Sequence, residues 1–289
     1  MLLDGLFAAS AHVDAQHYGP IQPEWTTPVT PFKITDNIYY VGSKDLAAYL
    51  IVTPAGEVLI NSNLESSVPQ ILDSIRQLGF KPADVKILLI SHAHYDHDGG
   101  SAGLKRTTGA KYMVMDADVP VVESGGAKDF AYPADRYPAA KVDRILHDGD
   151  EVKLGGVVLT AHNTAGHTRG CTTWTLRSPV NGTLRDVVIV GSWNVNDSFR
   201  LVDRPGKPAS YPGIAQDYAH SFAMLKSLKC DVFLGAHGVY FDMLAKLEKA
   251  KSGAGESAWI DPEGYKAKVE ERQRAFESAL KRQQSAATP

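Results

Sequence analysis

The feature that most constrains this chain is a dense group of metal-binding residue types at residues 91–100. Three histidines and one aspartate fall within six positions, at His92, His94, Asp96 and His97. The apolar run before the group predicts a strand, and the paired glycines after it predict the start of another element. The group is therefore expected on a loop that joins a strand to a helix, and functional sites commonly lie on such loops.

The spacing within this group predicts two metal positions. His92 and His94 are two residues apart, so in an extended segment they point to the same side, as two ligands of one ion would. Asp96 and His97 follow after the chain has begun to turn, which directs them to a second position. Catalytic metal sites keep one coordination position open, so two partly filled ions are favoured over a single ion closed by four ligands.

Two further histidines follow apolar runs elsewhere in the chain. His167 lies between flanking glycines that permit a tight turn, and His237 comes directly after an apolar segment. A lone histidine after a strand is commonly a surface or core residue, but the six-residue group favours a ligand role for both. Five histidines and one aspartate are therefore expected to meet at one sheet edge.

Composition excludes several classes of protein. The 289 residues are 44% hydrophobic and 22% charged, with a net charge of -3 and scattered basic residues, so no nucleic-acid-binding surface is predicted. No apolar run approaches the roughly 20 residues that span a bilayer. Residues 1–31 are interpreted as an N-terminal extension, either a secretory remnant, which its first apolar residues suggest, or a flap. Asp4 interrupts the apolar stretch and no basic residue precedes Lys33, so the sequence alone does not establish export. Residues 32–289 are expected to form a single domain.

Alternating apolar runs and helical patterns predict a mixed α/β fold with helices on two outer faces. Residues 120–138 have no periodicity and are expected to form a long loop, whose aromatic residues either line a substrate site or lie on a solvated surface excursion. Cys171 and Cys230 lie in or beside apolar runs and are expected to be structural. Strands are predicted at residues 37–41, 47–52, 58–60, 85–90, 111–115, 157–161, 172–176, 186–190 and 230–234, and helices at 68–78, 102–107, 214–228 and 261–284.

The string from His92 to His97, followed by His167 in a Gly-His-Thr context and by His237, resembles the metallo-β-lactamase superfamily over residues 32–245. The resemblance implies a four-layer αβ/βα sandwich, with two mixed sheets between outer helices and a dinuclear zinc site at one edge. It also implies two ligand sets: His92, His94 and His167 for one zinc ion, and Asp96, His97 and His237 for the other. Asp96, His94 and His167 are expected to take part in catalysis.

Ser192 indicates which branch of the superfamily the chain resembles. Thioester hydrolases, lactonases and phosphodiesterases place a bridging aspartate at this position, whereas serine together with His97 is similar to subclass B3 of the β-lactamases. The resemblance implies a role in antibiotic resistance, through hydrolysis of the β-lactam ring by metal-activated hydroxide. It further implies a monomer without a membrane span, in the periplasm or secreted. Ser192, Asn194 and Arg169 are the expected substrate contacts.

Three positions depart from the family pattern. Asn61 stands where an aspartate is usual, which would remove a carboxylate that orients the ligands, and Arg169 and Asn194 replace a proline and a serine. Two alternatives stay open. One is a thioester or lactone hydrolase of the glyoxalase II type, and the other is a non-catalytic zinc-binding protein on the same fold.

Overall fold

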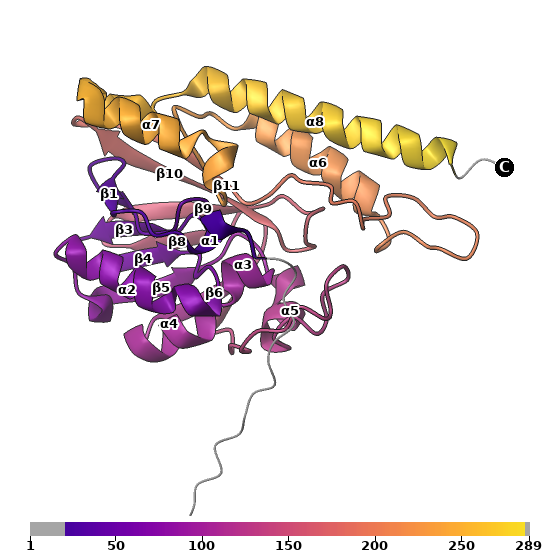
Figure 1. Ribbon diagram of the computed structural model, residues 1–289, viewed down its shortest axis with the longest axis horizontal. Helices are drawn as coiled ribbons and strands as arrows, with labels where there is room; N and C mark the ends of the chain where they lie inside the picture. Colours follow the sequence, from indigo (N-terminus) through magenta and orange to yellow (C-terminus); the bar gives the residue numbers. More distant parts are fainter. Residues whose placement is uncertain (1–20, 287–289) are drawn as a thin grey trace, which may run out of the picture.

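The computed structural model describes residues 21–286, which form two mixed sheets (Figure 1). The seven-stranded sheet has the order β1 (Phe32–Lys33), β2 (Ile38–Tyr40), β3 (Tyr49–Thr53), β4 (Gly56–Ile60), β5 (Val85–Leu89), β6 (Lys111–Met115), β7 (Arg144–Leu146). The five-stranded sheet has the order β12 (Val232–Gly235), β11 (Thr183–Val190), β10 (Thr172–Val180), β9 (Val157–Asn163), β8 (Glu151–Leu154). Strands β4 to β7 are parallel, as are β11 and β12, and the other neighbours are antiparallel.

Helices cover the outer face of each sheet, which confirms the predicted four-layer αβ/βα sandwich. In Figure 1, α2 and α4 lie against the first sheet, and α6 and the long α8 lie against the second. None of the helices within residues 21–286 is long and apolar enough to cross a bilayer. The helices are α1 (Pro23–Thr26), α2 (Val68–Gln77), α3 (Tyr95–Asp98), α4 (Ser101–Thr108), α5 (Val119–Glu123), α6 (Ile214–Ser227), α7 (Met243–Lys249) and α8 (Pro262–Ser285).

The central strands β3 and β4 of the first sheet are apolar on both faces because both faces are covered. Leu50, Leu59 and Leu88 are register neighbours on β3, β4 and β5, and they pack in one apolar cluster with residues of α2 and α4. Ile51 and Ile60 face the opposite way and join the core between the sheets. Alternate residues of a strand point to opposite faces, so each strand contributes to two hydrophobic layers.

All predicted strands and helices are present, with boundaries shifted by a few residues. The predicted strand at 172–176 extends to Val180, because β10 continues into a hairpin with β11. The elements that the sequence did not predict are short, namely β1, β7, β8 and the helices α1, α3, α5 and α7. The expected loop at 120–138 begins within α5. Cys171 and Cys230 are free and buried, and burial raises the pKa of each thiol to about 12.

Two hydrogen bonds join the sheets at the edge where β5 ends. The Thr172 amide donates to the Ser91 carbonyl at 2.7 Å, and the Trp174 indole donates to the Ile90 carbonyl at 3.0 Å. The start of β10 is thereby fixed against the chain that leaves β5. The loops that carry the predicted ligands consequently lie at one edge.

Asn61 supports this edge from the end of β4. It is fully buried with a left-handed φ of 68°, which asparagine tolerates better than most residues. Its Nδ2 donates to the Ala47 carbonyl at 3.0 Å, and its Oδ1 accepts from the Ser91 amide at 2.8 Å. An aspartate would keep the second bond but could not donate the first. The Asn61 amide therefore positions the start of the loop that follows β5 and carries the predicted ligands.

We expect Asn61→Ala to lower the free energy of unfolding by about 2 to 4 kcal/mol, because it leaves a buried N–H and a buried carbonyl without partners. Asn181→Ala is the matched control, since Asn181 also has positive φ (50°) but lies in an exposed turn. Urea unfolding of both variants measures the difference. Equal losses would mean that backbone conformation, and not the buried bonds, sets the cost.

Candidate metal centre

The structure brings the six predicted ligands into two adjacent groups. Ligand atoms of His92, His94 and His167 all lie within 4.8 Å of one another. In the second group, Nε2 of His97 lies 3.1 Å from Nε2 of His237 and 3.4 Å from Asp96 Oδ2.

The third side of the second group, between His237 Nε2 and Asp96 Oδ2, measures 3.7 Å. Ligand atoms about 2.0 to 2.1 Å from a tetrahedral zinc ion are separated by roughly 3.3 Å. The second group therefore already has the spacing of a metal site.

The local backbone conformation places the ligands of each group. His92 and His94 lie in the bend that follows β5, and Asp96 and His97 lie in the single turn of α3. His167 lies in the turn between β9 and β10, where Gly166 has a φ of 139° and a Cβ would approach the Tyr218 ring to 2.8 Å. Only glycine fits that backbone.

In three of the histidines, a carboxylate or a carbonyl contacts one ring nitrogen and leaves the other nitrogen available to bind a metal. Nδ1 of His237 contacts Asp45 Oδ2 at 2.9 Å, and Nδ1 of His167 contacts the Asn194 carbonyl at 3.0 Å. These partners require a proton on Nδ1, so Nε2 of each ring presents its lone pair to the centre. For His94 the contact is reversed: Nε2 lies 3.2 Å from Asp129 Oδ2, which leaves Nδ1 for a metal.

The protonation states of three of the histidines also suit metal binding. Burial lowers the pKa of His92 and His97 well below the ordinary value and that of His167 to about 3, so these rings are neutral near pH 7. Burial acts in the same direction on His94, but the Asp129 carboxylate outweighs it and raises that pKa. Nε2 of His92 is buried without a hydrogen-bond partner. A buried, neutral and unpartnered imidazole nitrogen fits a metal ligand.

Asp118 holds the two ligand loops together. It is 1% exposed, and its Oδ2 accepts from the Ala93 amide at 2.9 Å and from the Thr168 hydroxyl at 2.8 Å. Its Oδ1 accepts from the Gly170 amide at 2.8 Å. Ala93 lies between His92 and His94, and Thr168 follows His167. One carboxylate thus fixes the loop that follows β5 relative to the loop that precedes β10.

Sequence reasoning did not find the supporting aspartates Asp45, Asp118 and Asp129. Asp45 and Asp118 have no recognisable motif around them, and their role depends on contacts with residues far along the chain. Asp129 carried a weak signal, because it lies in the loop at 120–138 that was expected to be functional.

The three expected substrate contacts lie in different surroundings. Ser192 Oγ is 3.1 Å from the hydroxyl of Tyr240, and Asn194 Nδ2 donates to the same hydroxyl at 3.0 Å. Arg169 is exposed, and its guanidinium lies 5.4 Å from the centre of the Tyr211 ring. Ser192 and Asn194 are therefore joined through one tyrosine, whereas Arg169 packs on another.

Aromatic rings border the centre. Trp25 lies 6.0 Å from His237 and 6.1 Å from Tyr95, measured between ring centres. Tyr132, one of the aromatic residues proposed from the loop at 120–138, lies 5.3 Å from His94. Phe199 lies 5.8 Å from His167. The two groups of predicted ligands are thus bordered by aromatic rings, which lower the local dielectric constant.

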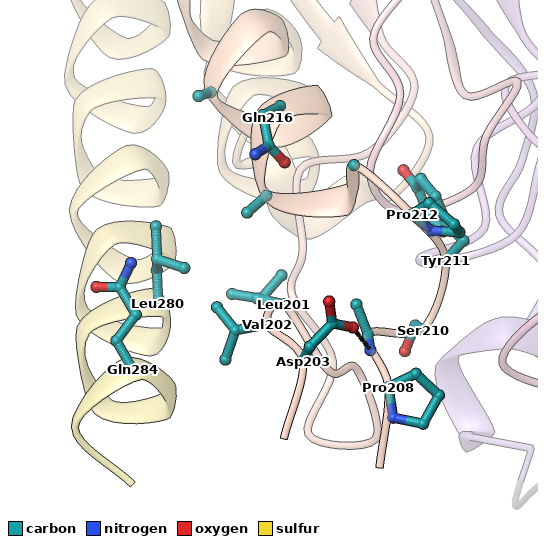
Figure 2. Close-up of a pocket in the computed structure, with 14 residues that line it drawn as sticks. Leu201, Val202, Asp203, Pro208, Ser210, Tyr211, Pro212, Gln216, Leu280 and Gln284 are labelled. Carbon is teal, nitrogen blue, oxygen red and sulfur yellow. Dashed lines mark hydrogen bonds between the residues drawn. The ribbon is translucent and has the colours of Figure 1, made fainter. Parts of the chain in front are cut away.

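A separate cavity of about 650 Å³ lies between the segment 201–213, α6 and α8 (Figure 2). Leu201, Val202 and Leu280 form its apolar side, and Asp203 and Gln216 contribute polar groups. None of the six predicted metal ligands lines this cavity. The candidate active site is therefore the group of metal ligands and not this cavity.

Comparisons with known proteins agree with this geometry. The profile of the metallo-beta-lactamase superfamily matches residues 46–237. A probable metallo-hydrolase of Burkholderia pseudomallei is 32% identical over 109 residues, which cover 38% of this chain and 36% of that protein. A hydroxyacylglutathione hydrolase of Rhodospirillum rubrum is 28% identical over 138 residues, covering 47% and 42%. The chain thus spans well under half the length of these curated relatives.

Solved structures match over nearly the whole chain. The native FEZ-1 metallo-beta-lactamase from Legionella gormanii is 50% identical, with a TM-score of 0.86 over 89% of this chain and 98% of that one. BJP-1, a subclass B3 metallo-beta-lactamase of Bradyrhizobium japonicum, is 39% identical, with a TM-score of 0.83 over 91% and 98%. LRA-12, a class B3 di-zinc metallo-beta-lactamase from an Alaskan soil metagenome, is 33% identical, with a TM-score of 0.82 over 91% and 99%.

We expect Asp118→Asn to weaken zinc binding by about 10- to 100-fold, because an amide nitrogen would face an N–H or O–H donor and loosen both ligand loops. Asp116→Asn is the control: Asp116 is exposed in the same short helix and accepts only from the Ala117 amide. Competition with a chromophoric chelator measures the affinity. Unchanged affinity in Asp118→Asn would show that the loops hold their places without this carboxylate.

Proposed function

Because the chain belongs to the metallo-beta-lactamase superfamily, we propose that it is a subclass B3 metallo-β-lactamase, which hydrolyses the β-lactam ring of antibiotics. The observation that carries this proposal is the complete set of six ligand side chains at one sheet edge, with Ser192 at the position that distinguishes the branches. The likeness to subclass B3 structures over about nine-tenths of the chain supports it.

We propose two zinc ions per chain. His92, His94 and His167 would hold one, and Asp96, His97 and His237 would hold the other. The di-zinc description of LRA-12 and the two groups of closely spaced ligand atoms support this. Bound zinc would act as a Lewis acid and would make water nucleophilic near neutral pH.

The protein residues prepare the centre for this reaction. Asp45, Asp129 and the Asn194 carbonyl fix the rings of His237, His94 and His167, so the metals and substrate meet a rigid arrangement.

We assign catalytic roles to Asp96, His94 and His167 through the metals that they position. Asp96 is 8% exposed, and its Oδ2 lies 3.4 Å from His97 Nε2 and 3.7 Å from His237 Nε2. Tyr132 and Trp25 would form walls against which a flat bicyclic substrate packs.

We propose that Ser192 and Asn194 bind the carboxylate that β-lactam antibiotics carry beside the ring, with Arg169 as a more distant contributor. Neutral hydroxyl and amide donors can recognise a carboxylate when they are partly buried and pre-positioned. Ser192 is 2% exposed and Asn194 is half-buried, and both lie directly after β11. The cation–π contact of Arg169 with Tyr211 places its charge on the outer rim.

The two alternatives lose part of their support. The hydroxyacylglutathione hydrolases match less than half of their own length, and no bridging aspartate stands at Ser192. The non-catalytic alternative rested on the missing carboxylate at Asn61. Carboxylates do support the ligands here, from Asp45 to His237 and from Asp129 to His94, and the Asn61 amide positions the ligand loop.

We also propose that the protein acts as an exported monomer, in the periplasm or secreted, as subclass membership suggests. Residues 32–289 would form the metallohydrolase domain. The part of the expected extension 1–31 that the structure describes begins at residue 21, and residues 1–20 lie outside it. Its Trp25 ring lies beside the His237 ring, with centres 6.0 Å apart, which supports a flap role for this part.

We expect zinc-loaded protein to open penicillin, cephalosporin or carbapenem rings with a kcat/KM of at least about 10⁴ M⁻¹s⁻¹, within the usual enzyme range. Zinc content is measured on the same sample, beside a glutathione thioester and a lactone. Fast thioester or lactone hydrolysis without lactam hydrolysis would select the first alternative. Stoichiometric zinc without turnover of any substrate would select the second.

We expect His237→Ala and His94→Ala each to retain about one zinc ion, because each removes a ligand from a different set of three. His220→Ala is the control, since His220 is exposed on α6 and should keep about two ions. Metal analysis after dialysis measures the content. Equal loss of both ions in each ligand variant would contradict separate sets.

A further inference from the structure

Tyr240 lies between the two residues assigned to the substrate carboxylate. It follows His237 by three residues, is 4% exposed, and its ring centre lies 5.1 Å from that of His237. Its hydroxyl contacts Ser192 Oγ at 3.1 Å and Asn194 Nδ2 at 3.0 Å. No other residue in the described part of the chain joins these two side chains.

The chemistry of the three groups sets the direction of one bond and leaves two arrangements for the other. An amide nitrogen can only donate, so Asn194 donates to the Tyr240 oxygen. Tyr240 and Ser192 are hydroxyls 3.1 Å apart, and either can donate to the other. When Tyr240 donates, Ser192 accepts and its own hydrogen is free to point elsewhere. The second Nδ2 hydrogen of Asn194 is also free.

The ring that carries this hydroxyl is firmly seated. A Cβ at Gly235 would come within 3.0 Å of the ring, so the ring lies directly on the backbone of β12. Trp193 packs on it with ring centres 5.2 Å apart. The hydroxyl therefore has little freedom, and the side chains of Ser192 and Asn194 orient to it.

We propose that Tyr240 is a positioning residue for substrate specificity: its hydroxyl orients Ser192 and Asn194 as a pair of free donors that bind a carboxylate. A site that directs two hydrogen-bond donors at the substrate binds a carboxylate more tightly than a neutral ester. The inference rests on the proposed function, because it names how that site selects its substrate. Tyr240 acts through Ser192 and Asn194 and need not touch the substrate.

The test compares a cephalosporin that has a free carboxylate with its methyl ester, using the zinc-loaded full chain. In Tyr240→Phe we expect KM to rise about three- to tenfold for the acid, the effect of weakening about one hydrogen bond to a charged group. For the ester we expect less than about a twofold change, with kcat for both substrates within about twofold. Zinc content should equal that of the wild type.

Tyr265→Phe is the matched control, because it removes a buried hydroxyl that donates to the Leu225 carbonyl, away from the centre. It should leave the ratio of acid to ester KM unchanged. In Ser192→Ala, adding Tyr240→Phe should have a smaller effect than it has alone, since the two act as one unit.

An equal KM change for acid and ester, or full additivity with Ser192→Ala, would overturn the proposal. A wild-type protein that hydrolyses neither lactam would instead refute the proposed function. Solution stability of Tyr240→Phe is measured in parallel by urea unfolding. If that variant does not fold, the ratio of acid to ester KM is measured in Ser192→Ala and Asn194→Ala instead. A ratio that is unchanged in both variants would contradict the donor pair.

Discussion

The buried carboxylate of Asp118 is the contact on which the centre depends. It receives hydrogen bonds from both ligand loops, and those loops come from different sheets. Burial raises its pKa to about 6, so the group is mainly ionised at neutral pH. A buried charge is stable only when donors compensate it, and here the donors are backbone and side-chain groups beside the ligands. The cost of burying the charge thereby enforces the spacing of the two loops.

Around this anchor, each ligand ring is fixed by a partner from a distant part of the chain. Asp45 follows β2, Asp129 follows α5, and Asn194 follows β11, yet all three contact imidazole nitrogens that face away from the centre. The arrangement divides the work between residues that would hold metal and residues that orient those ligands. Because the orienting groups belong to several elements, the centre is a property of the assembled sandwich and not of one loop.

The sequence predicted the ligands better than their supports, for a physical reason. The group at His92 to His97 is local, and its spacing alone limits what it can bind. Strand alternation and helical patterns likewise placed the main elements, because burial on two faces leaves a periodic signal. Asp118 and Tyr240 have no such signal, since their roles depend on contacts with Gly170 and Asn194 that only folding creates. Short elements such as β7 and α5 escaped prediction because few residues carry their pattern.

The segment around Trp25 is joined by backbone hydrogen bonds to the segment that carries Asp45, the partner of His237. The Asp45 amide donates to the Glu24 carbonyl at 3.2 Å, and the Lys44 amide donates to the Thr27 carbonyl at 2.8 Å. The backbone that carries Asp45 is thus paired with the segment that carries Trp25. Detachment of this segment would uncover His237 and loosen its carboxylate partner together. Local opening of this segment would therefore give a bound ion a route of exchange whose rate is distinct from its affinity.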